Sequence, residues 1–118
     1  GVRLVEDHLV QVLLNLGLNA LDALDHAGTL TFTTCVDDGA VELRVRDSGT
    51  GIAPESMARL FEPFHTTKAA GRGTGLGLFV SKRIIDDLGG QLRLERTGPG
   101  GTTFLIRLPI TPAPEEPR

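Results

Sequence analysis

The sequence predicts an α+β fold, a two-layer α/β sandwich in which three helices cover one face of a mixed, mainly antiparallel sheet. Apolar residues recur at helical spacing in three segments and alternate with polar residues in four others. Along the chain these segments run helix, two strands, two helices, two strands. Strands joined in pairs by short turns pair antiparallel, and helices grouped between such pairs cover one face of the sheet.

Length and composition indicate one globular domain. The chain has 118 residues and 15 glycines, and we place the domain at 1–108, followed by a disordered proline-rich tail at 109–118. A net charge of -3 and an aromatic content of 4% oppose nucleic acid as a partner. No run approaches the ~20 apolar residues of a membrane span, and the first residues lack a signal-peptide pattern. We therefore expect a cytoplasmic segment without direct membrane contact.

The first helix is predicted to begin at Asp7, which would cap it, and to end at Gly28. The residues before Asp7 are expected to belong to a strand that leads into this helix. Apolar residues recur through it at helical spacing: Val10, Leu13, Leu14, Leu18, Leu21 and Leu24. Beside them runs a polar stripe of Gln11, Asn15, Asn19 and Asp22. The stripe is either a solvated face or a set of side-chain oxygens offered to a hard cation that bridges phosphates.

Two strands follow, over 29–37 and 41–46, and Asp38-Gly39 between them is typical of a hairpin turn. The chain has one cysteine, Cys35, which excludes an internal disulfide and suits a reducing compartment. We interpret Cys35 as a core residue of the first strand.

Asp47 leaves the second strand and opens the sequence Asp-Ser-Gly-Thr-Gly. A carboxylate there can accept a hydrogen bond while Gly49 and Gly51 let the backbone approach a flat ligand. The alternative is a glycine turn that the aspartate caps.

A short helix is predicted to start at Pro54, and a polar, glycine-rich loop follows over 65–75. Apolar residues over 78–88 predict the third helix, which Gly89-Gly90 would end. Two further alternating segments, 91–97 and 102–108, predict a second hairpin.

Glycine alternates with other residues just before the third helix, at Gly71, Gly73, Gly75 and Gly77. Unpaired amides and the positive end of the helix would face whatever binds there, so an anion is expected. The segment matches neither the P-loop nor the dinucleotide fingerprint. Lys68 and Arg72 in the same loop either pair with phosphate oxygens or are solvated.

Five segments together resemble the N, G1, F, G2 and G3 boxes of histidine-kinase catalytic domains. They are QVLLNLGLNALDA (11–23), DSGTGI (47–52), LFEPFHTTK (60–68), GTGLGL (73–78) and GTTF (101–104). They occur in the family's order, and the resemblance covers 7–108. It implies the Bergerat ATP-binding fold, the cofactors ATP and Mg²⁺, and a protein-histidine kinase.

The resemblance also implies roles for single residues. Asp47 would accept the adenine amine and Thr102 would support it through water, while Asn19 would hold Mg²⁺ with Asn15 beside it. Catalytic residues would be Asn15, Asn19, Lys68 and Arg72. Phe61 and Phe64 would anchor a lid over the nucleotide. Further nucleotide-binding residues would be Asp22, Gly49, Gly51, Ile52, Phe64, Thr66, Thr67, Lys68, Arg72, Gly73, Thr74, Gly75, Leu76, Gly77 and Leu78.

By the same resemblance, the γ-phosphoryl group would pass to a histidine on a separate helical dimerisation and phosphoacceptor domain, with a response regulator downstream. The parent protein of such a two-component system can be anchored in the inner membrane. None of His8, His26 and His65 lies in a phosphoacceptor motif or shows metal-ligand spacing.

Asn15 stands where hydrolytic relatives place a glutamate, and an amide is no general base, so a kinase is favoured over an ATPase. The alternatives are an anti-sigma-type serine kinase or binding module of this fold, and an ATPase clamp.

Overall fold

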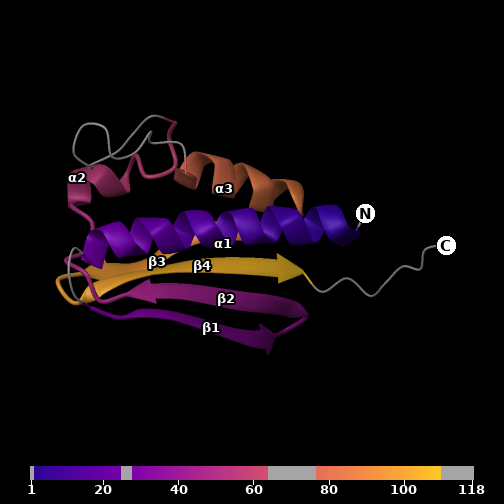
Figure 1. Cartoon of the computed structure of the whole chain (residues 1–118), viewed down its shortest axis with the longest axis horizontal. Coiled ribbons are helices and arrows are strands. Elements are labelled where there is room, and N and C mark those ends of the chain that lie inside the picture. Colours follow the sequence, from indigo (N-terminus) through magenta and orange to yellow (C-terminus); the bar gives the residue numbers. More distant parts are fainter. Residues whose placement is uncertain (1, 25–27, 64–76, 110–118) are drawn as a thin grey trace, which may run out of the picture.

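Three helices and four strands make up the part of the chain that the computed structural model describes, residues 2–24, 28–63 and 77–109. In chain order they are α1 (Val2–Leu24), β1 (Leu30–Asp37), β2 (Ala40–Asp47), α2 (Pro54–Met57), α3 (Gly77–Asp87), β3 (Gln91–Gly98) and β4 (Gly101–Pro109). All three helices lie on the same face of the sheet, so the predicted α+β sandwich is confirmed (Figure 1).

The sheet has the strand order β1-β2-β4-β3, and each neighbouring pair is antiparallel. Over the described residues the sheet is thus antiparallel throughout rather than mixed. Asp38 and Gly39 have φ angles of 50° and 77°, which matches the two-residue turn predicted for the first hairpin. The second hairpin turns at Pro99 and Gly100, because its strands continue to Gly98 and Gly101.

The predicted start of the first helix was wrong. Helix α1 begins at Val2, so Asp7 lies inside it rather than at its N-cap, and the residues expected to form a strand are helical. The physical reason is that the sequence between Val2 and Asp7 contains neither glycine nor proline, so nothing interrupts the helical hydrogen bonds. The helix ends at Leu24; residues 25–27, before the predicted stop at Gly28, lie outside the described residues. No helix of the described part is long and apolar enough to cross a bilayer.

The hydrophobic core lies between the sheet and the helices. Its buried members come from α1, α3 and three strands: Val12, Leu16, Val45, Ile85, Leu92, Phe104 and Ile106. Helix α1 packs against both β2 and α3, so it occupies the middle of the molecule. Burying one such side chain stabilises the fold by about 1.5 to 3 kcal/mol, and these contacts fix α1 against the strands that carry the polar residues described below.

Cys35 is exposed, so its interpretation as a core residue was wrong. It lies on β1, an edge strand on which every residue after Leu30 is exposed. Phe32 faces the helices, since its ring lies near Gly17 of α1, and strand alternation therefore places Cys35 on the face without helices. Alternation in the sequence marks two faces but does not say which of them is covered.

The hairpin between β3 and β4 approaches the end of β2 very closely. Gly101 has a φ of 135°, which side chains rarely adopt, and a Cβ atom there would overlap the carbonyl oxygen of Asp47. Gly100, the preceding residue, has open space around the same position. A side chain can therefore be added at Gly100 without a clash but not at Gly101.

We expect Gly101→Ala to lower the free energy of unfolding by about 2 to 4 kcal/mol, because the alanine is strained and displaces the end of β2. Gly100→Ala, the matched control, should change it by less than about 1 kcal/mol. Urea denaturation of both variants measures this difference. Equal stability of the two variants would contradict the close approach.

Candidate functional site

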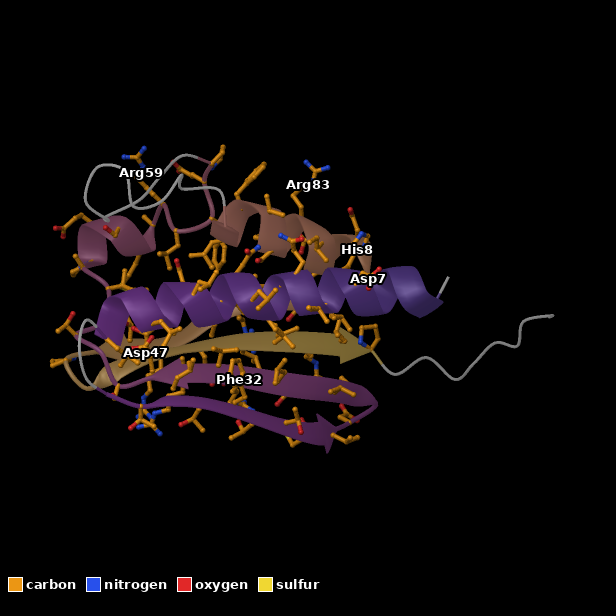
Figure 2. The ribbon with its side chains drawn as sticks, viewed as in Figure 1. Asp7, His8, Phe32, Asp47, Arg59 and Arg83 are labelled. Atoms are coloured by element: carbon orange, nitrogen blue, oxygen red, sulfur yellow. The ribbon has the colours of Figure 1, made fainter. Side chains whose placement is uncertain are left out.

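Asp47 ends strand β2 with its side chain toward the helices, because it shares the face of the core residue Val45. In Figure 2 it lies at the end of the sheet beneath the C-terminal part of α1. Only 5% of the residue is exposed, and its Oδ1 accepts a hydrogen bond of 2.8 Å from the Gly49 amide. Its second oxygen, Oδ2, has no hydrogen-bond partner among the described residues. This nearly buried carboxylate can therefore accept a hydrogen bond from a ligand that enters beside it.

A chain of hydroxyl groups lies next to Asp47. Thr102 is the residue opposite Asp47 on β4, and 4% of it is exposed. Its Oγ1 lies 2.8 Å from Oγ1 of Thr97, which also accepts a 2.9 Å hydrogen bond from the amide of Ile52. Thr102 is thus tied to Thr97, with no direct hydrogen bond to Asp47 in the described structure. Its support of Asp47 through water stays a prediction.

Thr97 is a residue that the sequence motifs missed. It lies outside all five segments, yet it is paired with Thr102 across the β3–β4 hairpin and holds the amide of Ile52. Two threonines placed opposite each other in a predicted hairpin were the signal that could have found it, since opposed residues share a face.

The loop after Asp47 is pressed onto the β3–β4 hairpin. Gly51 has a φ of 90°, and a Cβ atom there would overlap the carbonyl oxygen of Gly98. Gly49 is buried, while Ile52 is half-buried and packs against the core. The loop is therefore held in a fixed position beside the Asp47 carboxylate. The slot for a flat ligand between them stays a prediction.

The polar stripe of α1 divides into different environments. Gln11 is exposed, whereas Asn15 and Asn19 are half-buried. The Nδ2 atom of Asn15 donates to Oγ of Ser81 at 3.2 Å and to the carbonyl oxygen of Gly77 at 3.4 Å, both on α3. Asn15 is therefore not part of a solvated face, because its side chain joins α1 to α3. The side chain of Asp22 lies outside the described residues.

Helix α3 begins at Gly77, so its first turn lies beside Asn15. Leu78, the next residue, packs against the core. The glycine-rich segment before it is not described, so the predictions there stay untested for Phe64, Thr66, Thr67, Lys68, Arg72, Gly73, Thr74, Gly75 and Leu76. His26 and His65 also lie outside the described residues, as does the tail from 110 on.

Phe61 stands just before that segment and is firmly placed. Its ring meets Phe104 of the core edge to face, with centroids 6.4 Å apart at 79°. The ammonium of Lys82 on α3 lies 5.9 Å from its centroid. Phe61 thus fastens the chain to both layers of the sandwich, which fits its predicted role as an anchor.

The polar groups form two sets in the helix-covered layer. Asp47, Thr102 and the amide of Ile52 gather at the sheet's end, while Asn15 and the first turn of α3 meet above α1. No group of three His, Cys, Asp or Glu side chains suited to a metal ion exists within the described ranges. A metal ion here would therefore rely on amide oxygens, its own waters and the oxygens of a ligand.

A separate hollow of about 780 Å³ lies along the face without helices, lined mainly by threonine and arginine side chains of the strands. There Arg44 donates to both oxygens of Glu95, at 2.8 and 2.9 Å, and this hydrogen bonding lowers the pKa of the Glu95 carboxyl. The ion pair therefore persists at neutral pH and is lost only as the pH falls through that lowered pKa. Asp47 and Ser48 are among the residues that line this hollow. The side chain of Asp47 shares the helix-covered face of Val45, however, so we place the candidate site on that face and not in the hollow.

Known proteins match this chain along nearly its whole length. A family model described as histidine kinase-, DNA gyrase B-, and HSP90-like ATPase matches residues 4–112. The two-component sensor PprA of Pseudomonas aeruginosa is 45% identical over 98% of this chain and 13% of its own length. The sensor histidine kinase ZraS of Escherichia coli is 39% identical over 95% of this chain and 24% of its own. The chain thus spans no more than about a quarter of these relatives.

Solved structures agree in fold. The catalytic domain of histidine kinase ThkA superposes with a TM-score of 0.78 at 36% identity, covering 89% of this chain and 68% of that one. Full-length ShkA, solved in complex with AMPPNP, gives 0.76 at 35% identity over 86% of this chain and 21% of its own.

We expect Thr97→Val to lower the free energy of unfolding by about 1 to 2 kcal/mol and to speed hydrogen exchange at the Ile52 amide, because valine fits the space but accepts no hydrogen bond. Thr97→Ser keeps the hydroxyl and is the matched control. Denaturation and exchange measured by NMR test both variants. An Ile52 amide equally protected in the valine variant would refute the role given to Thr97.

Proposed function

This chain belongs to the histidine kinase-, DNA gyrase B- and HSP90-like ATPase family, and from that premise we propose that it is the catalytic domain of a sensor histidine kinase. It binds Mg-ATP and transfers the γ-phosphoryl group to a histidine on a separate helical domain. A response regulator then acts downstream in two-component signalling. The sensor kinases among its relatives favour this function over an anti-sigma-type kinase or an ATPase clamp.

The observation that carries the proposal is the buried carboxylate of Asp47. Oδ1 is occupied by the Gly49 amide, which leaves Oδ2 as an acceptor at the mouth of a slot walled by Gly51 and Ile52. Adenine offers an exocyclic amine to such an acceptor. Guanine presents a carbonyl oxygen at the same place, which a carboxylate repels, so the site selects ATP over GTP.

The phosphates would lie toward the first turn of α3. Helix α3 begins at Gly77, and a helix N-terminus offers amides and a partial positive charge to anions, which supports the anion site predicted from the glycine pattern. Half-buried Asn19 on α1 supplies an amide oxygen, a ligand type that suits Mg²⁺ when waters and phosphates complete the shell. When bound, Mg²⁺ would neutralise charge on the phosphate oxygens. Lys68 and Arg72 remain predicted partners of the same phosphates.

Phosphoryl transfer suits these residues better than hydrolysis does. Hydrolysis needs a base to activate water, whereas the amide of Asn15 is no base and its nitrogen is engaged with α3. An imidazole nitrogen already has its lone pair and needs mainly positioning. His8 does not supply it, because His8 and Asp47 lie toward opposite ends of α1 (Figure 2). None of the three histidines of the chain lies in a phosphoacceptor motif, so we expect the acceptor histidine on another domain of the parent protein.

Asp47→Asn should weaken ATP binding by about ten- to a hundredfold, because the amide loses the charge and turns an NH₂ group toward the adenine amine. Asp38→Asn makes the same chemical change at the opposite end of β2, where asparagine tolerates the positive φ, and should leave binding unchanged. Calorimetric titration of both variants with Mg-ATP measures this. Binding by Asp47→Asn that equals the parent's would remove Asp47 from the site.

The chain alone should bind Mg-ATP without appreciable hydrolysis or self-phosphorylation, since Asn15 is no base and none of the three histidines lies in a phosphoacceptor motif. Adding the helical domain of the parent kinase as a separate polypeptide should restore transfer. Label from γ-³²P-ATP is then expected on the added domain, acid-labile and base-stable as phosphohistidine is. Label on this chain alone, or rapid ATP turnover without a partner, would contradict the proposal.

A further inference from the structure

Ser81 is a fully buried polar residue in the middle of α3. Its exposed fraction is 0%, and its hydroxyl accepts the hydrogen bond from Nδ2 of Asn15 on α1. A buried hydroxyl is costly unless it is hydrogen-bonded, so this pairing determines how the two helices meet. No motif quoted from the sequence contains Ser81.

The same contact fixes which way the Asn15 amide points. The second partner of Nδ2 is the carbonyl oxygen of Gly77, which only accepts hydrogen bonds. The nitrogen must therefore face α3, and Oδ1 of Asn15 faces away from both partners. Gly77 and Ser81 lie one helical turn apart, so a single side chain of α1 holds the first turn of α3 at two points.

Asn15 also lies one turn before Asn19 on α1. Asn19 is the ligand proposed for Mg²⁺, and Gly77 is the first residue of the helix proposed to meet the phosphates. The hydrogen bonds from Asn15 to α3 thus connect the two elements that must contact the same triphosphate. Any change in the spacing of α1 and α3 would move one of them off the phosphates.

We propose that Ser81 is a positioning residue, which holds Asn15 and the first turn of α3 at the spacing from Asn19 that Mg-triphosphate requires. This rests on the proposed function and extends it to a residue that does not touch the nucleotide. The adenine slot at Asp47 is built from the sheet and its loop, so it does not depend on Ser81. Loss of the Ser81 hydroxyl therefore affects the phosphate end of the ligand and leaves the adenine end intact.

The test compares Mg-ATP with adenosine, which carries the same base and no phosphate. In NMR titrations that follow the Gly49 and Ile52 amides, Ser81→Ala should weaken Mg-ATP binding by about five- to tenfold and leave adenosine binding unchanged. Ser81→Cys, close in volume with a weaker acceptor, should give a smaller loss in the same direction and serves if the alanine variant does not fold. Ser56→Ala, another buried helical serine, is the control and should not alter the ratio of the two affinities.

The possible results distinguish a failure of the Ser81 role from a failure of the proposed function. Unchanged affinity for both ligands, or an equal loss for both, would overturn the positioning role of Ser81, because a purely structural serine cannot discriminate phosphate from base. A parent chain that binds neither ligand would overturn the proposed function itself. Selective loss of Mg-ATP affinity in the Ser81 variants supports the inference.

Discussion

The end of the sheet where β2 finishes depends on backbones that approach one another too closely for side chains. Gly101 lies against the carbonyl of Asp47, and Gly51 lies against the carbonyl of Gly98. These two contacts press the loop after β2 onto the β3–β4 hairpin and bring Ile52 within reach of Thr97. The buried Asp47 carboxylate owes its surroundings to them, because a Cβ atom at either glycine would push the loop away.

Helix α1 contacts both the sheet and helix α3, and so it sets the position of α3 relative to this end of the sheet. Val12 and Leu16 bury one side of the helix against the strands, an interaction that is strong but not directional. Direction comes from Asn15, whose hydrogen bonds to Gly77 and Ser81 orient α3. Apolar contacts thus hold the layers together, and a few polar contacts set where the ligand-binding groups of each layer lie.

Several elements could be predicted because they depend on residues close together in the sequence. These are both hairpins, the short helix at Pro54 and the helix that starts at Gly77. The start of α1 was missed because a capping residue is also compatible with a helix interior. The exposure of Cys35 was missed because alternation does not reveal which face is covered. Thr97 and Ser81 lie outside the sequence motifs. Hairpin register could have paired Thr97 with Thr102, but the amide of Ile52 that Thr97 holds and the Asn15 partner of Ser81 lie far away along the chain. Asp47 was predicted as a site residue and its buried, hydrogen-bonded carboxylate fits, while the residues over 64–76 keep only their predicted roles.

The most direct test of the central claim is a crystal structure of this chain with Mg²⁺ and the ATP analogue AMPPNP. The account predicts the adenine amine on Oδ2 of Asp47, the metal ion at Asn19, and the phosphates at the first turn of α3 beside Gly77. Nucleotide bound instead in the hollow on the face without helices, or an adenine that avoids Asp47, would contradict it.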